Sequence, residues 1–121
     1  MTVLDASAIL AFLQGERGED LVEAALLDGA ICGAANWSEV AQKLLAAGRD
    51  WQSAVALLAS YDVAIEPVTR EDAELAAAAW HPGSKLSLAD RLCQALSRRL
   101  DERVLTADRS WGTSDRVQQI R

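Results

Sequence analysis

Short, uninterrupted apolar runs alternate along the chain with longer segments in which apolar residues recur three or four positions apart. The short runs are typical of strands that are buried on both faces of a parallel sheet, whereas the longer segments have the period of a helix. We predict strands at 1–5, 30–35, 63–68, 103–106 and 117–120, the last being the weakest. The predicted helices cover 7–13, 20–27, 36–47, 50–61, 70–80 and 87–100.

The order of these elements predicts the architecture. Helical segments separate successive strands, which favours parallel pairing with right-handed crossovers and helices on both faces of the sheet. With 121 residues and no internal repeat or linker, the chain is expected to form one domain, residues 1–121. The fold predicted is a three-layer α/β/α sandwich with a central parallel sheet.

Capping signals mark several of the predicted helix starts. Ser7 is placed to cap the helix at 7–13, and Ser87-Leu-Ala-Asp90 has the spacing of a capping box. Asn36-Trp-Ser-Glu39 and Thr69-Arg-Glu-Asp72 have the same spacing. Capping is therefore a sufficient explanation for Glu39 and Asp90 when each is considered alone.

Four acids nevertheless map to one edge of the predicted sheet. Asp5 and Asp108 follow strands directly, and Glu39 and Asp90 lie in the first turn of predicted helices. Strand exits and helix entries meet at the edge where open α/β sheets bind ligands. Four converging carboxylates would repel one another unless a cation lay between them. The pattern predicts a Mg²⁺ or Mn²⁺ site and, with it, metal-assisted phosphodiester hydrolysis.

Neighbouring short hydroxyl residues could support such a site. Ser7 and Thr106 lie beside the strand-end acids and are candidates to hold ligands or waters in place. Zinc is not expected, because His81 is the only histidine and Cys32 and Cys93 lie far apart in apolar segments. Both cysteines are interpreted as reduced core residues.

Composition limits the partners and the location. The net charge of −6 disfavours nucleic acid, although it falls to −2 without the four candidate acids. No apolar stretch approaches the ~20 residues that a membrane span requires. No basic segment precedes the first apolar run, so a secretory signal is not expected and we predict a cytoplasmic protein.

Around the four acids, the sequence resembles the PIN-domain family, and more narrowly the VapC-type toxin ribonucleases. The blocks that carry the resemblance occur in order and span essentially the whole chain. They are Val3-Leu-Asp-Ala-Ser-Ala-Ile-Leu10, Asn36-Trp-Ser-Glu-Val40, Leu86-Ser-Leu-Ala-Asp-Arg-Leu-Cys93 and Val104-Leu-Thr-Ala-Asp-Arg-Ser-Trp111.

The resemblance implies a Mg²⁺- or Mn²⁺-dependent endoribonuclease that acts on structured RNA such as tRNA or rRNA. It also implies metal ligation by Asp5 and Asp90, with Glu39 and Asp108 completing the acidic pocket. A homodimer and a small antitoxin partner are implied as well. Candidates for RNA contact are Arg91 and Arg109, each of which follows a site acid, and Lys85 in the loop before the last long helix.

Three alternatives stay open. A PIN-like nuclease could process RNA without acting as a toxin. A phosphotransfer domain could use Asp5 as a nucleophile, although Asp5-Ala-Ser7 lacks the second acid two residues on. A non-catalytic module could use the acidic pocket to dock an arginine of a partner.

Overall fold

A computed structural model describes all residues, 1–121, and contains one five-stranded sheet with the strand order β3-β2-β1-β4-β5. All neighbouring strands are parallel, which confirms the predicted three-layer α/β/α sandwich. The strands are β1 (Thr2–Leu4), β2 (Ala30–Gly33), β3 (Ala64–Glu66), β4 (Val104–Thr106) and β5 (Val117–Gln119).

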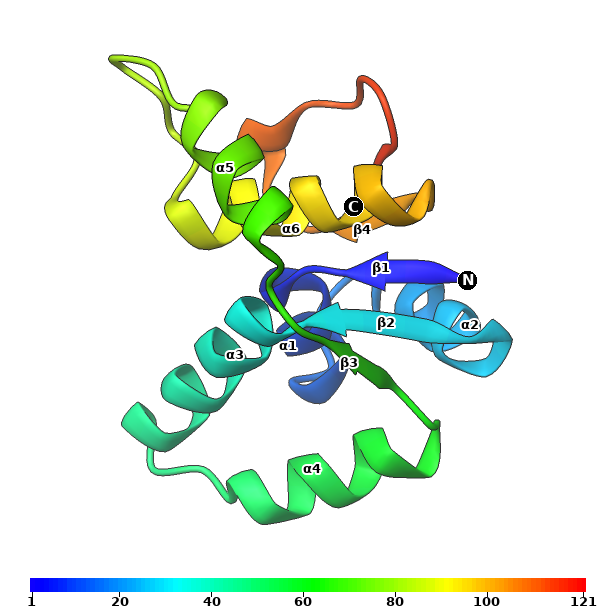
Figure 1. Ribbon diagram of the computed structural model, residues 1–121. Helices are drawn as coiled ribbons and strands as arrows, with labels where there is room; N and C mark the ends of the chain where they lie inside the picture. Colours follow the sequence, from blue (N-terminus) through cyan, green and yellow to red (C-terminus); the bar gives the residue numbers. More distant parts are fainter.

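The helices cover the two faces of the sheet (Figure 1). They are α1 (Ala6–Leu13), α2 (Glu19–Asp28), α3 (Ala34–Ala46), α4 (Trp51–Ser60), α5 (Arg70–Ala78) and α6 (Leu88–Leu100), with a 3₁₀ turn η1 (Arg109–Trp111). In Figure 1, α5 and α6 lie in the upper half of the view beside β4, and α4 lies at the bottom beyond β3. The apolar clusters show the two faces: α6 packs on one, and α1 and α2 pack on the other. Helix α3 contacts both α1 and α6, so it joins the two layers beside the strand ends. None of the helices has the length and apolar character that crossing a bilayer requires.

Successive strand residues pack against opposite layers. Val3 and Val104 belong to the apolar cluster around Leu96 of α6, whereas Leu4 and Leu105 belong to the larger cluster around α1 and α2. This is the two-residue period of a strand with both faces covered. The central strands are therefore fully buried, and their positions are fixed from both sides.

Two predicted helix starts are wrong. Asp5, not Ser7, caps α1: its carboxylate accepts a hydrogen bond from Ala8 N at 2.8 Å, so β1 passes into α1 through one residue. Helix α3 begins at Ala34 after Gly33, which places Asn36 inside the helix instead of at its cap. The predicted strand at 30–35 correspondingly ends at Gly33.

The other two predicted capping boxes are confirmed. Ser87 and Asp90 cap α6 reciprocally, as Thr69 and Asp72 cap α5. Asp72 also joins the two helices, because its buried carboxylate accepts hydrogen bonds from Arg99 at 3.0 and 3.2 Å. Burial opposes ionisation of Asp72, but the hydrogen bonds from Arg99 and Thr69 outweigh it and lower the pKa. The α5–α6 pair is thus held as a unit above the sheet.

Candidate active site

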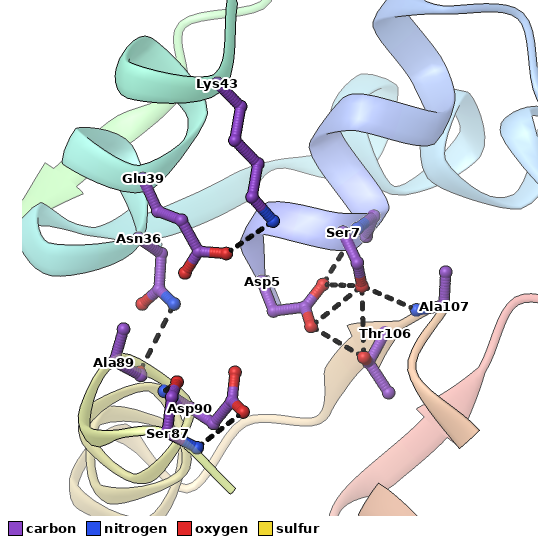
Figure 2. A network of polar contacts seen from close by, with 11 residues as sticks. Asp5, Ser7, Asn36, Glu39, Lys43, Ser87, Ala89, Asp90, Thr106 and Ala107 are labelled. Atoms are coloured by element: carbon purple, nitrogen blue, oxygen red, sulfur yellow. Dashed lines mark hydrogen bonds and ion pairs between the residues drawn. The ribbon is translucent and has the colours of Figure 1, made fainter. Parts of the chain in front are cut away.

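Asp5 is the centre of a buried hydrogen-bond network at the carboxyl end of β1 (Figure 2). Its carboxylate accepts hydrogen bonds from Thr106 Oγ1 at 2.6 Å and from Ser7 Oγ at 2.8 Å, besides that from Ala8 N. The two hydroxyl oxygens in turn accept from backbone N–H groups, Ser7 from Ala107 and Thr106 from Asp108. Adjacent strand ends, β1 and β4, therefore fix the orientation of one carboxylate.

Burial controls the ionisation of Asp5. The residue is only 3% exposed, and this desolvation raises its pKa from 3.8 to about 6. The hydrogen bonds from Thr106, Ala8 and Ser7 favour the ionised form and lower the pKa, whereas the charge of Asp90 raises it further. Since burial is the largest cause, a cation beside Asp5 would relieve an unfavourable buried charge.

Asp90 and Glu39 face Asp5 from α6 and α3, which in Figure 2 lie to its lower left and upper left. Asp90 Oδ2 accepts a hydrogen bond from Ser87 N at 2.9 Å, while Asp90 Oδ1 has no hydrogen bond. Glu39 lies in the second turn of α3, and Glu39 Oε2 forms an ion pair with Lys43 Nζ at 3.0 Å. Each acid thus keeps one oxygen free of protein partners.

The buried thiol of Cys93 is influenced by the same acids. Burial raises its pKa well above the usual value, and the negative charges of Asp5, Asp90 and Glu39 contribute to that rise, together with Cys32. Cys93 is one turn along α6 from Asp90 and is fully buried. Three carboxylates therefore act on the same region between the sheet, α3 and α6.

Asn36 fixes the spacing of the two helices. Its side chain is buried and donates from Nδ2 to the carbonyl oxygen of Ala89 at 3.3 Å. Ala89 immediately precedes Asp90, and Asn36 lies one helical turn before Glu39. This contact ties the first turn of α6 to α3, and so sets where Asp90 lies relative to Glu39.

Asp108 is placed differently from the other three acids. Its carboxylate caps η1, accepting hydrogen bonds from Ser110 N at 2.9 Å and Ser110 Oγ at 2.7 Å. As the side chains stand, no three acids, histidines or cysteines lie close enough together to hold a metal ion. Asp5, Glu39 and Asp90 thus face the same region without meeting around a common point, and Asp108 contacts this network only through its backbone N–H.

The basic residues differ in what they contact. Arg91 donates from a terminal guanidinium nitrogen to Ala76 O at 2.6 Å, so its side chain lies against α5. Arg109 and Lys85 are exposed, in η1 and in the loop before α6. Lys43, which contacts Glu39, was not among the residues selected from the sequence. The signal that could have identified it is the Glu39-x-x-x-Lys43 spacing, which places both side chains on one helix face.

The donors available at the site suit a hard divalent cation. They are carboxylate and hydroxyl oxygens, the ligands that Mg²⁺ and Mn²⁺ prefer. Asp5 is oriented by its network, and the free oxygens of Asp90 and Glu39 belong to partly exposed side chains. The chemistry of the donor set therefore fits the cation, although the side chains are not gathered around one.

A buried aspartate at a strand exit, faced by acids from two helices, defines an α/β domain with an oxygen-lined acidic site at the carboxyl edge of its sheet. The PIN domain matches residues 2–115, so the chain belongs to the PIN domain family. This confirms the family resemblance of the four sequence blocks. A search of the curated proteins finds no match.

Several solved structures share the fold. A toxin–antitoxin complex from Klebsiella pneumoniae is similar over 100% of this chain and 98% of its own, with a TM-score of 0.77 and 18% identity. FitAcB from Neisseria gonorrhoeae matches 99% of this chain and 98% of its own (TM-score 0.70, 19% identity). VapC20 from Mycobacterium tuberculosis, a Sarcin-Ricin loop cleaving toxin, matches 88% of each chain (TM-score 0.65, 17% identity).

Proposed function

We propose that this protein is a Mg²⁺- or Mn²⁺-dependent endoribonuclease that hydrolyses RNA phosphodiesters and serves as the toxin of a type II toxin–antitoxin pair. The observation that carries the proposal is the buried, oriented carboxylate of Asp5, which faces Asp90 and Glu39 at the carboxyl edge of the sheet. Burying a carboxylate without a cation is unfavourable, so the arrangement is costly unless it serves binding or chemistry.

Asp5 and Asp90 are the residues that would hold the cation most directly, with Glu39 beside them. Asp108, two residues beyond Thr106, is proposed as the fourth acid of the pocket. A bound divalent cation supplies an acidified water and neutralises charge on the phosphodiester. No histidine is needed as a general base. His81 lies in an exposed loop, where its ring nitrogen Nδ1 is hydrogen-bonded to Pro82 O.

Neighbouring polar residues favour the ionised form of Asp5 and fix the position of Asp90. Thr106 and Ser7 donate hydrogen bonds to Asp5 and favour its ionised form, which is the form that binds a cation. Asn36 holds the start of α6 against α3 and so places Asp90. The backbone positions of Asp5 and Asp90 are thus set by strand and helix ends, so only side-chain movements are needed to bring the carboxylates together.

The toxin role, with an antitoxin partner, is supported by the kinds of protein that share the fold, and a cytoplasmic location is part of the same proposal. One is a toxin–antitoxin complex and another is FitAB bound to a DNA fragment. The Sarcin-Ricin loop cleaving toxin makes structured ribosomal RNA a first substrate to test, followed by tRNA. A homodimer is part of the same proposal.

One observation favours a second candidate, a docking module for a partner arginine. Glu39 already pairs with a cation of its own chain, Lys43, and no three carboxylates are gathered as a metal site. A group of carboxylates of this kind would accept an arginine from a partner peptide. Calorimetric titration with Mn²⁺ separates the two, because a docking module should bind no Mn²⁺ at Asp5.

Cleavage of RNA by the purified protein tests the proposal. We expect cleavage of ribosomal RNA in Mg²⁺ or Mn²⁺, none in EDTA, and loss of cleavage in Asp5→Asn and in Asp90→Asn. Asp50→Asn is the matched control: Asp50 also caps a helix through its side chain, on α4, and should leave cleavage unchanged. Retained metal-dependent cleavage by both site variants would refute the assignment.

A further inference from the structure

Lys43 is the one basic residue of the chain that forms an ion pair with a candidate site acid. Its ammonium group lies 3.0 Å from Glu39 Oε2, and the Lys43 and Glu39 side chains are 56% and 27% exposed. Figure 2 shows the Lys43 side chain reaching along α3 to Glu39, with the ammonium group on the side toward Asp5 in this view. The contact places an exposed positive charge beside the acids of the proposed site.

Several arginines on or near α6 contact other groups of the chain. Arg91 donates to a carbonyl of α5, Arg99 pairs with Asp72, and Arg116 pairs with Asp101 and Asp115. Arg103 contacts Thr2 and Gln118 at the amino edge of the sheet. Unlike these arginines and the exposed Arg109 and Lys85, Lys43 lies directly against a carboxylate of the proposed site, where it can meet a negatively charged substrate.

The simplest alternative is a helix-stabilising pair. Lys43 follows Glu39 by four residues and lies in the last turn of α3, where a positive charge complements the helix dipole. Exposed pairs of this kind contribute little to stability. This alternative predicts a small loss of stability on removing Lys43, and no effect on substrate.

Electrostatic repulsion gives a reason for a positive charge beside the site acids. RNA is a polyanion, the chain has a net charge of −6, and the proposed site is itself acidic. An ammonium group on a long, flexible side chain can contact a phosphate oxygen while it stays within reach of Glu39. If Glu39 turned to hold a divalent cation, the Lys43 ammonium group would lose its partner and could contact the phosphate.

We propose that Lys43 is a phosphate-binding residue of the active site, held in place by Glu39 until substrate binds. The proposal rests on the nuclease function proposed above and adds a substrate contact to it. Because the contact is to phosphate, it should act on every RNA sequence alike. It should also depend on charge, so that arginine replaces lysine at this position better than methionine does.

The test compares Lys43→Met and Lys43→Arg with wild type, and uses Arg70→Met as the control. Arg70 pairs with Glu74 at the same four-residue spacing and the same 3.0 Å, on α5. We expect Lys43→Met to lower kcat/KM by about tenfold, mainly through KM, and to reduce the slope of log KM against log salt by about 1. Lys43→Arg should keep most of the activity, and Arg70→Met all of it.

A second measurement removes catalysis from the comparison. RNA binding by Asp5→Asn and by the double variant Asp5→Asn/Lys43→Met, measured by fluorescence anisotropy, should differ about tenfold at low salt and less at high salt. Mn²⁺ titration of Lys43→Met should show affinity at least equal to that of wild type, because removing a neighbouring positive charge favours a cation.

The outcomes distinguish the two proposals. Active wild-type protein with an unchanged Lys43→Met variant refutes the phosphate-binding role and leaves the nuclease function standing. A loss of activity with unchanged salt dependence and weaker Mn²⁺ binding also refutes it, since the residue would then act by placing Glu39. If wild-type protein cleaves no RNA under any metal condition, the nuclease function fails, and the role of Lys43 fails with it.

Discussion

Replacing Asp5 by asparagine should change how the stability of the metal-free protein depends on pH. Asparagine has nearly the same shape, remains a good helix cap, and can accept the hydrogen bond from Ala8 N. It carries no charge, so the variant removes the ionisation of Asp5 while it keeps most of the local structure. The hydroxyl groups of Thr106 and Ser7 can rotate to accept from the new amide group.

The expected size follows from the pKa of Asp5. Burial raises it from 3.8 to about 6, and at about 1.4 kcal/mol per pH unit the difference corresponds to about 3 kcal/mol. Because the folded state has the higher pKa, Asp5 contributes its full stabilisation below pH 4 and loses it as the pH rises to about 6. Above pH 6, metal-free wild type should therefore pay the whole cost of a buried charge that the variant avoids.

Urea unfolding in EDTA between pH 3.5 and 8 measures this effect. The free energy of unfolding of wild type, minus that of Asp5→Asn, should fall by about 3 kcal/mol across pH 4 to 6 and then level off. Asp50→Asn provides a control of opposite sign: the hydrogen bonds from Ser53 lower the pKa of Asp50, so its contribution is lost as the pH falls. A wild-type minus Asp5→Asn difference that stays flat across this range would refute the reasoning.

Three further variants test individual contacts. Thr106→Val removes the 2.6 Å hydrogen bond to Asp5 and should therefore raise the pKa of Asp5. The pH profile of cleavage should move to higher pH, and the free energy of unfolding in urea should fall by about 1 kcal/mol. Ser87→Ala removes the cap of α6 and should lower the free energy of unfolding by about 1 kcal/mol, an effect absent if the helix frays in wild type. Arg99→Met leaves the buried Asp72 without its partner and should cost about 2 kcal/mol by the same assay, whereas an unchanged midpoint would show that the α5–α6 contact does not depend on the pair.

The sheet and most helices could be predicted from the sequence because their signals are local. Continuous apolar runs such as Val3-Leu4 and Val104-Leu105 report burial on both faces, and the structure places them at the centre of the sheet. The capping boxes that begin at Ser87 and Thr69 could be predicted for the same reason, because the two residues of each box lie within four positions of each other.

The errors arose where one residue has two structural roles. Asp5 ends β1 and caps α1 at once, so a prediction that reserves separate residues for strand end and cap moves the cap to Ser7. Gly33 likewise ends β2 and precedes α3 directly, which shifts the helix start by two residues and moves Glu39 from the first turn to the second. That shift explains why Glu39 faces the site instead of capping its own helix.

Other features depend on contacts that sequence spacing does not encode. That the carboxylate of Asp108 caps η1 depends on the turn conformation around Ser110. The contact of Asn36 with Ala89 joins residues 53 positions apart, and it emerges only when α3 and α6 pack together. The sequence therefore predicts that the four acids share one edge of the sheet. It does not predict the direction in which each acidic side chain points.

The position of a bound cation tests the central claim most directly, that Asp5, Asp90 and Glu39 form a site for a divalent metal. Crystals grown with Mn²⁺ and measured for anomalous scattering would locate it. We expect a peak about 2.2 Å from carboxylate oxygens of Asp5 and Asp90, with Glu39 turned from Lys43 toward it, and no peak in Asp5→Asn. A structure at saturating Mn²⁺ with no peak at Asp5, or with Lys43 still paired to Glu39 and the metal bound elsewhere, would contradict it.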